Sequence, residues 1–363
     1  MNFSNFRTDL PALLLYNIDP SWPHQDAQDC HAAAHMLKGA LTEVGHPIQE
    51  VCIHSADLQE ALEYFSPNEY LIFNWCEELP GIPRSASLVA QTLELMGFTY
   101  TGASAEALTL SQDKRQVKAR LRAQGIPTPR WQIYNTARSD GWDCFPAIVK
   151  PAFEHCSFGV TRDAVVQSPT ELADRVRYVL DTFEQPALIE EFIDGREFHV
   201  AVLGNGKLHM LPPAEMDFSA FDNVKDRLCT FESKFDPQST SYNLIELHLP
   251  AFLTQDEQCL IEGTALSAYR AVDCRDYARM DLRLRDGVFY VLDVNPNADI
   301  SPDTSLALAA GVIGLSYGQL GSLLINLAAQ RNQPFLDWHN PKEERELHKC
   351  WESISQTGKS KNT

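Results

Sequence analysis

Two short segments of alternating polar and apolar residues, separated by Asp286 and Gly287, constrain the fold more than any other feature of the chain. One segment covers residues 279–284 and the other covers residues 292–295. Because the side chains of a strand point alternately to its two faces, each segment is expected to form a strand with one apolar face. The pattern predicts an antiparallel hairpin with Met280, Leu282, Leu284, Tyr290, Leu292 and Val294 in the core and Arg279, Asp281, Asp293 and Asn295 facing a cleft.

The length of the turn decides the register of this hairpin. A two-residue turn would pair Asp281 with Leu292 and place the two aspartates on opposite faces. A three-residue turn pairs Asp281 with Asp293, Arg279 with Asn295, and Leu282 with Leu292. Hairpin loops of three residues with a glycine in the left-handed conformation are common. The apolar pattern favours this second register, because a slip by one residue would turn the core face outwards.

The predicted hairpin brings two carboxylates and one amide oxygen to the same space. Oxygen ligands of this kind suit a magnesium ion that protein and phosphate hold together. Asp281, Asp293 and Asn295 are therefore candidate metal ligands. A solvated hairpin face with incidental charges is the plain alternative, and the local pattern alone leaves it open.

The remainder of the chain predicts two kinds of architecture. Up to about residue 105, apolar strands alternate with helical segments, which is typical of a parallel α/β unit. Beyond it the pattern predicts a helix over 111–123, a hairpin of residues 147–150 with 159–160, and a mobile loop over 217–242. Further strands are expected at 187–193 and 198–203.

Charge and cysteine spacing narrow the functional classes. The chain has 30 basic and 49 acidic side chains, which gives a net charge of −19. A nucleic-acid-binding protein needs a basic surface, so we expect no nucleic-acid partner. No two cysteines have C-x-x-C spacing, which favours reduced thiols in the cytoplasm. Neither a signal peptide nor a membrane-spanning segment is expected, so we predict no membrane partner.

Several polar residues next to predicted strands and helices are candidates for a nucleotide site. Lys150 ends an apolar strand beside a loop, and Lys114 lies near a helix start, where a cation without an anionic partner is unfavourable. The loop over residues 154–159 offers backbone N–H groups that suit phosphate. Glu190 and Glu191 end another strand, which is compatible either with an exposed strand end or with a hinge that binds adenine.

In order and spacing, these segments resemble the D-alanine–D-alanine ligase branch of the ATP-grasp superfamily. Each segment is a weak signal by itself, but the ordered set extends over about residues 70–325. The similar segments are 111–114, 146–151, 157–160, 189–198, 278–281 and 293–296.

The resemblance implies an ATP-grasp fold of the α/β (α+β) class. An N-terminal parallel α/β domain would precede two α+β subdomains that clasp ATP. On this sequence we expect an N-terminal substrate domain at 1–108 and a central subdomain with the phosphate loop at 109–186. A C-terminal subdomain with the metal site would cover 187–335, and a polar tail would cover 336–363.

The resemblance also implies which residues contact the phosphates. Lys114 and Lys150 would bind the α- and β-phosphates, and Ser157 with its loop would close over them. Lys234 matches a lysine that reaches the γ-phosphate from a mobile loop. Arg279 would stabilise the charge of an acyl phosphate and of the tetrahedral intermediate that follows it.

The remaining implied roles concern the nucleoside and the metal. Glu190 and the backbone of Glu191 and Ile193 would bind adenine, while Glu197 would hold the ribose. Two Mg²⁺ ions, with Mn²⁺ as a substitute, would be held by Asp281, Asp293 and Asn295. Of these ligands, Asp293 stands where the family usually has a glutamate.

The implied activity is that of a cytoplasmic ATP-dependent carboxylate–amine ligase. It would join a small acid to a small amine through an acyl phosphate, with ADP and phosphate as products. Because members of the family are often dimeric, the resemblance also leaves a homodimer open. One alternative is an ATP-grasp protein that makes an acyl phosphate for a non-amine acceptor. Another is a nucleotide-binding module without catalysis, against which the intact set Lys150, Arg279, Asp281, Asp293 and Asn295 argues.

The chain departs from the family where the first substrate would bind. Residues 16–20 stand in place of a glycine- and serine-rich motif with a glutamate, and residues 74–81 replace a His-Gly-x-x-Gly-Glu-Asp-Gly segment. We therefore expect a first substrate other than D-alanine. Candidate residues for the second substrate follow the metal strand, and they are Ser301, Asp303, Thr304 and Ser305. An aspartate at position 303 favours an amine over a carboxylate there.

Overall fold

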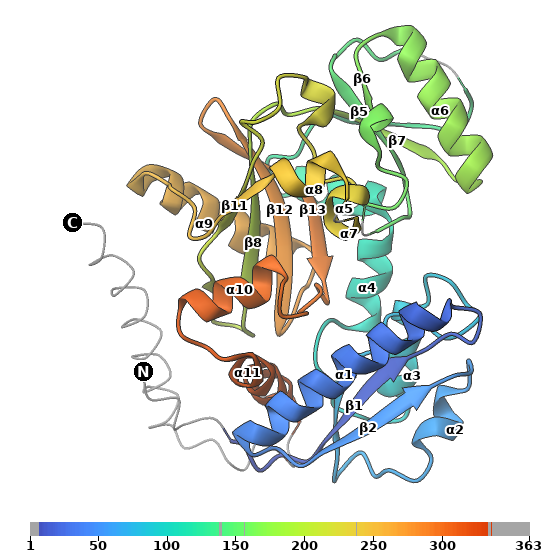
Figure 1. Cartoon of the computed structure of the whole chain (residues 1–363), viewed down its shortest axis with the longest axis vertical. Coiled ribbons are helices and arrows are strands. Elements are labelled where there is room, and N and C mark those ends of the chain that lie inside the picture. Colours follow the sequence, from blue (N-terminus) through green and yellow to red (C-terminus); the bar gives the residue numbers. More distant parts are fainter. Residues whose placement is uncertain (1–6, 138–139, 156, 237, 333–334, 336–363) are drawn as a thin grey trace.

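Three sheets organise the part of the chain that the computed structural model describes, which comprises residues 7–137, 140–155, 157–236, 238–332 and 335. In the view of Figure 1, the N-terminal sheet and its helices lie at the bottom and a small sheet with one long helix lies at the top right. The largest sheet lies between them. This mixed architecture confirms the expected fold class.

The N-terminal sheet is parallel, as predicted. Its central strand β1 (Ala12–Asn17) is buried along its whole length and lies between β2 (Ile48–Ile53) and β3 (Leu71–Trp75). A continuous apolar strand is typical of a parallel sheet that is covered on both faces. The covering helices are α1 (His24–Val44), α2 (Leu58–Leu62) and α3 (Ala86–Leu95).

The helix predicted over 111–123 is divided in two, so this prediction was wrong. The chain forms α4 (Ala105–Gln112) and α5 (Lys114–Ala123), with Asp113 between them in an extended conformation. The Asp113 carboxylate accepts a hydrogen bond from the Arg115 backbone N–H at 3.0 Å. An aspartate that caps a helix in this way starts a new helix, and the start of α5 places Lys114 at a helix N-terminus.

The small sheet is antiparallel and has the order β4–β7–β5–β6. Its strands are β4 (Trp131–Tyr134), β5 (Ala147–Pro151), β6 (Val165–Val166) and β7 (Ala187–Glu191), and α6 (Pro169–Phe183) packs on it. Because β7 pairs with β4 and β5, the sheet continues to residue 191, beyond the boundary placed at 186.

The partner that we predicted for residues 147–150 was also wrong. The strand pairs with β6 and β7, whereas residues 159–160 belong to the preceding loop. The Val160 N–H donates to the Ser157 carbonyl at 2.9 Å, and both Ser157 and Gly159 have positive φ angles (60° and 75°). This backbone forms a tight turn and not an extended strand.

The large sheet carries most of the C-terminal half. Its strands follow the order β11 (Glu246–His248), β10 (Ala214–Asp217), β8 (Arg196–Leu203), β12 (Tyr277–Arg285) and β13 (Val288–Pro296), and β9 (His209–Met210) also pairs with β8. One face is covered by α9 (Gln255–Ala271), and the chain continues into α10 (Ser305–Val312) and α11 (Tyr317–Ala329).

The segment over 217–242, which we expected to be an irregular mobile loop, contains short helices. After the end of β10, the chain forms a 3₁₀ turn, η2 (Val224–Asp226), and then the short helices α7 (Glu232–Phe235) and α8 (Thr240–Leu244). The sequence did not predict these single turns, because a polar helix of four or five residues is too short to show a helical repeat of apolar residues. A second 3₁₀ turn, η1 (Arg162–Ala164), lies beside η2.

The hairpin of β12 and β13 has the predicted pairing of its polar residues but reaches it differently. Arg279 lies opposite Asn295, and Asp281 lies opposite Asp293. The turn contains two residues, Asp286 and Gly287, both with positive φ angles of 52° and 75°. This is the conformation of a type I′ turn, for which Asp-Gly is a favoured sequence.

A β-bulge restores the register that a three-residue turn would have given. Beyond the Leu282–Val291 pair, the register shifts by one residue, so that Leu292 is the extra residue on β13. As a result Phe289, Val291, Val294 and Pro296 are the buried residues of this strand, and Leu292 lines the cleft instead. Our prediction of Leu292 and Tyr290 in the core was wrong for this reason.

Gly102 joins the N-terminal unit to the large sheet. Its N–H donates to the buried Asp276 carboxylate at 2.8 Å, and its φ angle is 93°. A Cβ atom at this position would lie 2.1 Å from the side-chain oxygen of Asn297. Only glycine permits this approach.

Among the described residues, no single helix is long and apolar enough to cross a membrane, and the pair α10–α11, bent by 101°, meets the criterion only by length and composition.

Candidate active site

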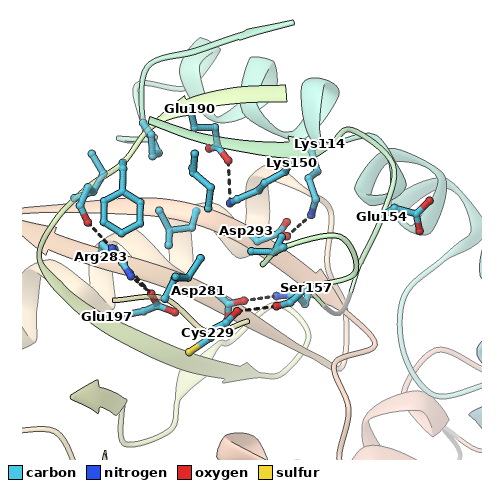
Figure 2. A pocket seen from close by; sticks show the side chains of 18 of the residues that line it. Lys114, Lys150, Glu154, Ser157, Glu190, Glu197, Cys229, Asp281, Arg283 and Asp293 are labelled. Atoms are coloured by element: carbon cyan, nitrogen blue, oxygen red, sulfur yellow. Dashed lines mark hydrogen bonds and ion pairs between the residues drawn. The ribbon is translucent and has the colours of Figure 1, made fainter. Parts of the chain in front are cut away.

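A pocket between the small sheet and the large sheet gathers most of the predicted site residues (Figure 2). It encloses about 910 Å³ of empty space, including the part open to solvent. Its walls come from α5, β5, β7, β8, β12, β13 and the loop after β5. The predicted residues that line it are Lys114, Lys150, Ser157, Glu190, Glu191, Ile193, Glu197, Arg279, Asp281, Asp293 and Asn295.

Five of the predicted residues stand apart from this set, because one side chain is not described and four do not line the pocket. Lys234 belongs to α7, but its side chain lies outside the described part. The lining also omits the four candidate substrate residues, Ser301, Asp303, Thr304 and Ser305. Two of them have local partners: the Ser301 hydroxyl donates to Asp299 at 2.7 Å, and Thr304 caps α10.

Lys114 and Asp293 form an ion pair that ties the start of α5 to β13 (Figure 2). Burial opposes ionisation of Asp293, but the cationic Lys114 and the nearby His155 hold the pKa of this carboxyl below its ordinary value. Burial, assisted by Lys114, lowers the pKa of His155 to about 4. At neutral pH the site therefore contains a charged carboxylate beside a neutral imidazole.

The second aspartate has a different set of partners. Arg279 donates to Asp281 through Nε at 2.7 Å and through Nη2 at 3.1 Å. The amide nitrogen of Asn295 donates to the same carboxylate at 3.1 Å, so the amide oxygen is the atom that remains to accept. Two carboxylates and an amide oxygen on one face form a set of hard ligands that fits magnesium.

Glu190 lies between two lysines in the interior of the pocket wall. Its exposed fraction is 1%, and it forms ion pairs with Lys118 and with Lys150, the latter at 3.0 Å. Burial would raise the pKa of Glu190, but Lys118 and then Lys150 hold it below its ordinary value. The alternative prediction, in which Glu190 lies at an exposed strand end, is therefore wrong.

Lys118 is a residue of this site that the sequence analysis missed. Its Nζ donates to Thr128 Oγ1 at 3.1 Å and to the carbonyl of the bulged Leu292 at 3.2 Å. The signal for it was present, because Lys118 follows Lys114 by four residues, which places both lysines on the same face of α5.

Arg283 is the second missed residue, and it connects three segments of the pocket wall. Its guanidinium donates to Glu197 at 2.7 Å, to the Ile193 carbonyl at 2.8 Å and to the Arg227 carbonyl. Arg279, Asp281 and Arg283 are two residues apart along β12 and therefore lie on the same face of the strand. The alternation in the sequence was thus a signal for Arg283. The arginine holds Glu197 and the segment after η2 in fixed positions.

Ser157 connects the loop after β5 to that same segment. Its hydroxyl donates to the Cys229 carbonyl at 3.0 Å, an interaction drawn in Figure 2. The loop thus lines one side of the pocket, where Ser157 lies below Lys114 and Asp293 in the view of Figure 2. Backbone N–H groups in such a tight turn suit the binding of an anion.

Comparisons with known proteins agree with this geometry. Residues 122–326 match the family model described as the D-ala D-ala ligase C-terminus. An uncharacterised protein of Sinorhizobium fredii, y4sG, is 34% identical over 322 residues, which cover 85% of this chain and 89% of that protein. A D-alanine–D-alanine ligase of a Marinomonas species is 32% identical over 237 residues, which cover 64% of this chain and 70% of that ligase.

The likeness extends to solved structures. A D-alanine–D-alanine ligase of Bacillus anthracis, in complex with ATP, superposes with a TM-score of 0.66. The match covers 89% of this chain and 98% of that structure at 21% sequence identity. By sequence and by fold, the chain belongs to the D-alanine–D-alanine ligase family of ATP-grasp proteins.

Proposed function

We propose that the protein is a magnesium-dependent ligase that joins a carboxylate to an amine through an acyl phosphate. Family membership supports ATP-dependent ligase activity on small molecules. The observation that carries the proposal is the convergence of Lys114, Lys150, Arg279, Asp281 and Asp293 on one pocket. Three cations and two carboxylates at one place suit the polyphosphate of ATP and the metal that accompanies it.

The nucleoside would bind at the end of the pocket formed by β7 and β8. Glu190 and the backbone of Glu191 and Ile193 would contact adenine, and Glu197 would hold the ribose. Support comes from Arg283, which fixes both Glu197 and the Ile193 carbonyl before any ligand arrives. A hinge that is ordered in advance loses less entropy on binding.

The phosphates would lie against Lys114 and Lys150, with Ser157 and its loop closing over them. Lys234 would add a further cation from the segment that contains α7. Asp281, Asp293 and Asn295 would hold two Mg²⁺ ions, for which Mn²⁺ would substitute. Metal held there would neutralise the charge that develops on the transferred phosphoryl group.

The reaction would proceed in two steps. A carboxylate oxygen of the first substrate attacks the γ-phosphorus, ADP leaves, and an acyl phosphate forms. The amine of the second substrate then attacks the carbonyl carbon, the C–O bond breaks, and phosphate leaves with the former carboxylate oxygen. Arg279 would stabilise the negative charge in both steps, which is the largest kind of catalytic contribution in such sites.

The first substrate would differ from D-alanine. At the end of β1, Asn17 accepts a hydrogen bond from the Glu77 N–H at 3.1 Å, so this edge is occupied by contacts within the chain. The match with the D-alanine–D-alanine ligase of Marinomonas also covers a smaller share of this chain (64%) than the match with y4sG (85%). The region 301–305 would receive the second substrate, and Asp303 would favour an amine.

The domain boundaries, the cellular location and the oligomeric state are part of the same proposal. A substrate domain at 1–108 would precede a central subdomain that begins at 109 and a metal-binding subdomain that ends at 335, with the boundary between these two after β7 and not at 186. The protein would act in the cytoplasm, and a homodimer stays open.

Phosphate release from MgATP tests the proposal. The chain is incubated with a panel of amino acids and small acids, singly and in pairs, and the nucleotide product is identified. The proposal predicts release with an acid–amine pair, with ADP as the product. Asp293→Ala should abolish the release, whereas Asp286→Ala, in the exposed turn of the same hairpin, should retain it. Formation of AMP and pyrophosphate would contradict the acyl-phosphate mechanism.

A further inference from the structure

A second group of metal-ligating side chains lies in the same pocket, next to Asp281 of the predicted magnesium site. It consists of Glu197, His199 and Cys229, whose candidate ligand atoms all lie within 4.8 Å of one another. Glu197 and His199 are alternate residues of β8, so their side chains leave the same face of the sheet. Cys229 approaches from the segment after η2, and Figure 2 shows it beside Glu197.

The contacts of Glu197 and His199 keep their candidate ligand atoms close to each other. One oxygen of Glu197 accepts from Arg283 at 2.7 Å, and the other lies 3.9 Å from His199 Nε2. The same histidine nitrogen lies 4.0 Å from an oxygen of Asp281. Glu197 and His199 are largely buried, with exposed fractions of 6% and 9%.

The position of Cys229 is fixed through its backbone. Its carbonyl accepts from the Ser157 hydroxyl at 3.0 Å, and the carbonyl of Arg227, two residues earlier, accepts from Arg283. The cysteine is therefore anchored on both sides of its own Cα atom. Hydrogen bonds around a ligand residue orient it before the metal binds.

We propose that Glu197, His199 and Cys229 form a binding site for a thiophilic divalent cation of the zinc class. A thiolate, an imidazole and a carboxylate are the ligands that Zn²⁺ takes in proteins, and Mg²⁺ does not select sulfur. Zinc ligands at bond lengths of about 2.0–2.3 Å lie roughly 3.3–3.7 Å apart in a tetrahedron. The three side chains therefore need to close by about an ångström. Binding converts the Cys229 thiol to a thiolate and releases its proton to solvent.

The site has a consequence for nucleotide binding that rests on the proposed function. Glu197 would hold the ribose of ATP, so zinc bound to this carboxylate would compete with the nucleotide. The competition would act at the nucleoside end of the pocket, where the zinc-ligating His199 Nε2 lies 4.0 Å from Asp281, a proposed magnesium ligand. Zinc would thus be an inhibitor whose effect excess ATP reverses.

Titration of the full chain with Co²⁺ tests the metal site without any substrate or nucleotide. Cobalt occupies zinc sites and gives a near-ultraviolet charge-transfer band when a thiolate is a ligand. We expect a saturable band that stoichiometric Zn²⁺ abolishes and that a large excess of Mg²⁺ does not. Cys229→Ser should remove the band, whereas Cys259→Ser, at an exposed position of α9, should retain it.

Affinity measurements with a chromophoric chelator provide the second readout. Cys229→Ser and His199→Asn should each weaken zinc binding by about 100-fold or more, since even changes outside the ligand sphere cost 10–100-fold. If Cys229→Ser does not fold, the zinc affinity of His199→Asn is compared with that of the unmodified chain instead. The absence of a band, or a band that persists in Cys229→Ser, would overturn the site. A zinc-loaded chain whose thermal stabilisation by MgATP is unchanged would overturn the competition alone.

Discussion

Asp281 lies directly opposite Asp293 in the β12–β13 ladder, although the turn that joins these strands contains only two residues. The extra residue Leu292 makes this possible, because the bulge shifts the register between the turn and the aspartates. Bulges are frequent next to active sites, where they redirect side chains. Here the bulge directs the side chains of both aspartates towards one pocket.

The two aspartates should be needed for magnesium-dependent ATP binding. We predict that Asp293→Asn loses the extra thermal stabilisation that MgATP gives over ATP alone, and that its Kd for MgATP rises about 10–100-fold, because a carboxylate ligand is lost. Differential scanning fluorimetry and titration calorimetry measure both effects. Asp286→Asn is the matched control at an exposed position of the same hairpin. An unchanged magnesium effect in Asp293→Asn would refute the metal assignment.

Glu190 should contribute strongly to stability because it neutralises the buried Lys118 and the largely buried Lys150. Glu190→Gln leaves Lys118 and Lys150 without their carboxylate, and we expect the free energy of unfolding to fall by about 3–5 kcal/mol. Urea denaturation of the full chain measures this loss. Adding Lys118→Met should restore part of the stability, since one uncompensated buried charge is removed.

A surface substitution of the same type calibrates that experiment. Glu69→Gln, at an exposed position, should change the free energy of unfolding by less than about 0.5 kcal/mol. Equal stability of Glu190→Gln and Glu69→Gln would show that the buried lysines do not depend on Glu190.

His46 should make stability depend on pH in the acid range. Its ring is buried, with Nδ1 3.1 Å from the Leu10 carbonyl and Nε2 2.8 Å from the Ser322 hydroxyl. A carbonyl only accepts, so Nδ1 carries the proton and Nε2 accepts from Ser322. Burial is the main cause that lowers the pKa of His46 below its ordinary value of 6.5. The neutral form is therefore the form that the fold stabilises.

The sign of the pH effect follows from linkage. Below about pH 6.5 the unfolded chain binds a proton at this histidine that the folded chain does not, so stability falls as the pH falls towards the lowered pKa. We predict that His46→Gln has a shallower decline of Tm between about pH 6.5 and pH 5 than the unmodified chain. His54→Gln, at an exposed position, should keep the original slope. Parallel profiles for all three proteins would rule out this role of His46.

Arg283 should control nucleotide affinity through its positioning of Glu197. Arg283→Lys keeps the charge but cannot reach Glu197 and two carbonyls at once, because lysine lacks the planar fork of arginine. We expect the Kd for ATP to rise at least about 10-fold, while a small change in Tm would separate this effect from global unfolding. Arg162→Lys, which alters an exposed arginine paired with Asp226, is the control. An unchanged ATP affinity in Arg283→Lys would contradict the positioning role.

The sequence predicted the elements and residues whose patterns are local. Continuous apolar strands identified the parallel N-terminal sheet, and alternation in β12 and β13 identified the face that carries Asp281 and Asp293. The break between α4 and α5 could not be read from periodicity, because it depends on the extended backbone of Asp113 and on its side chain, which caps the start of the second helix. The bulge at Leu292 could not be predicted either. A three-residue turn without a bulge and a two-residue turn with a bulge both pair Asp281 with Asp293.

Long-range contacts account for what the sequence could not predict of the site. Lys118, Arg283 and Cys229 are placed by segments up to 174 residues away, as in the hydrogen bond from Lys118 to Leu292. Local pattern indicates on which face of a helix or strand such residues lie, but not which carboxylate or carbonyl they meet. The ion pairs of Glu190 with two lysines join residues of α5, β5 and β7, and no single segment encodes this combination.

Oxygen transfer from the acid to phosphate tests the central claim most directly. An acid that supports phosphate release with an amine is labelled with ¹⁸O in its carboxylate, and the phosphate formed from MgATP is analysed by mass spectrometry. An acyl-phosphate ligase must place one carboxylate oxygen in each phosphate, so we predict phosphate carrying a single ¹⁸O together with ADP. Unlabelled phosphate, or label found in AMP, would contradict the account.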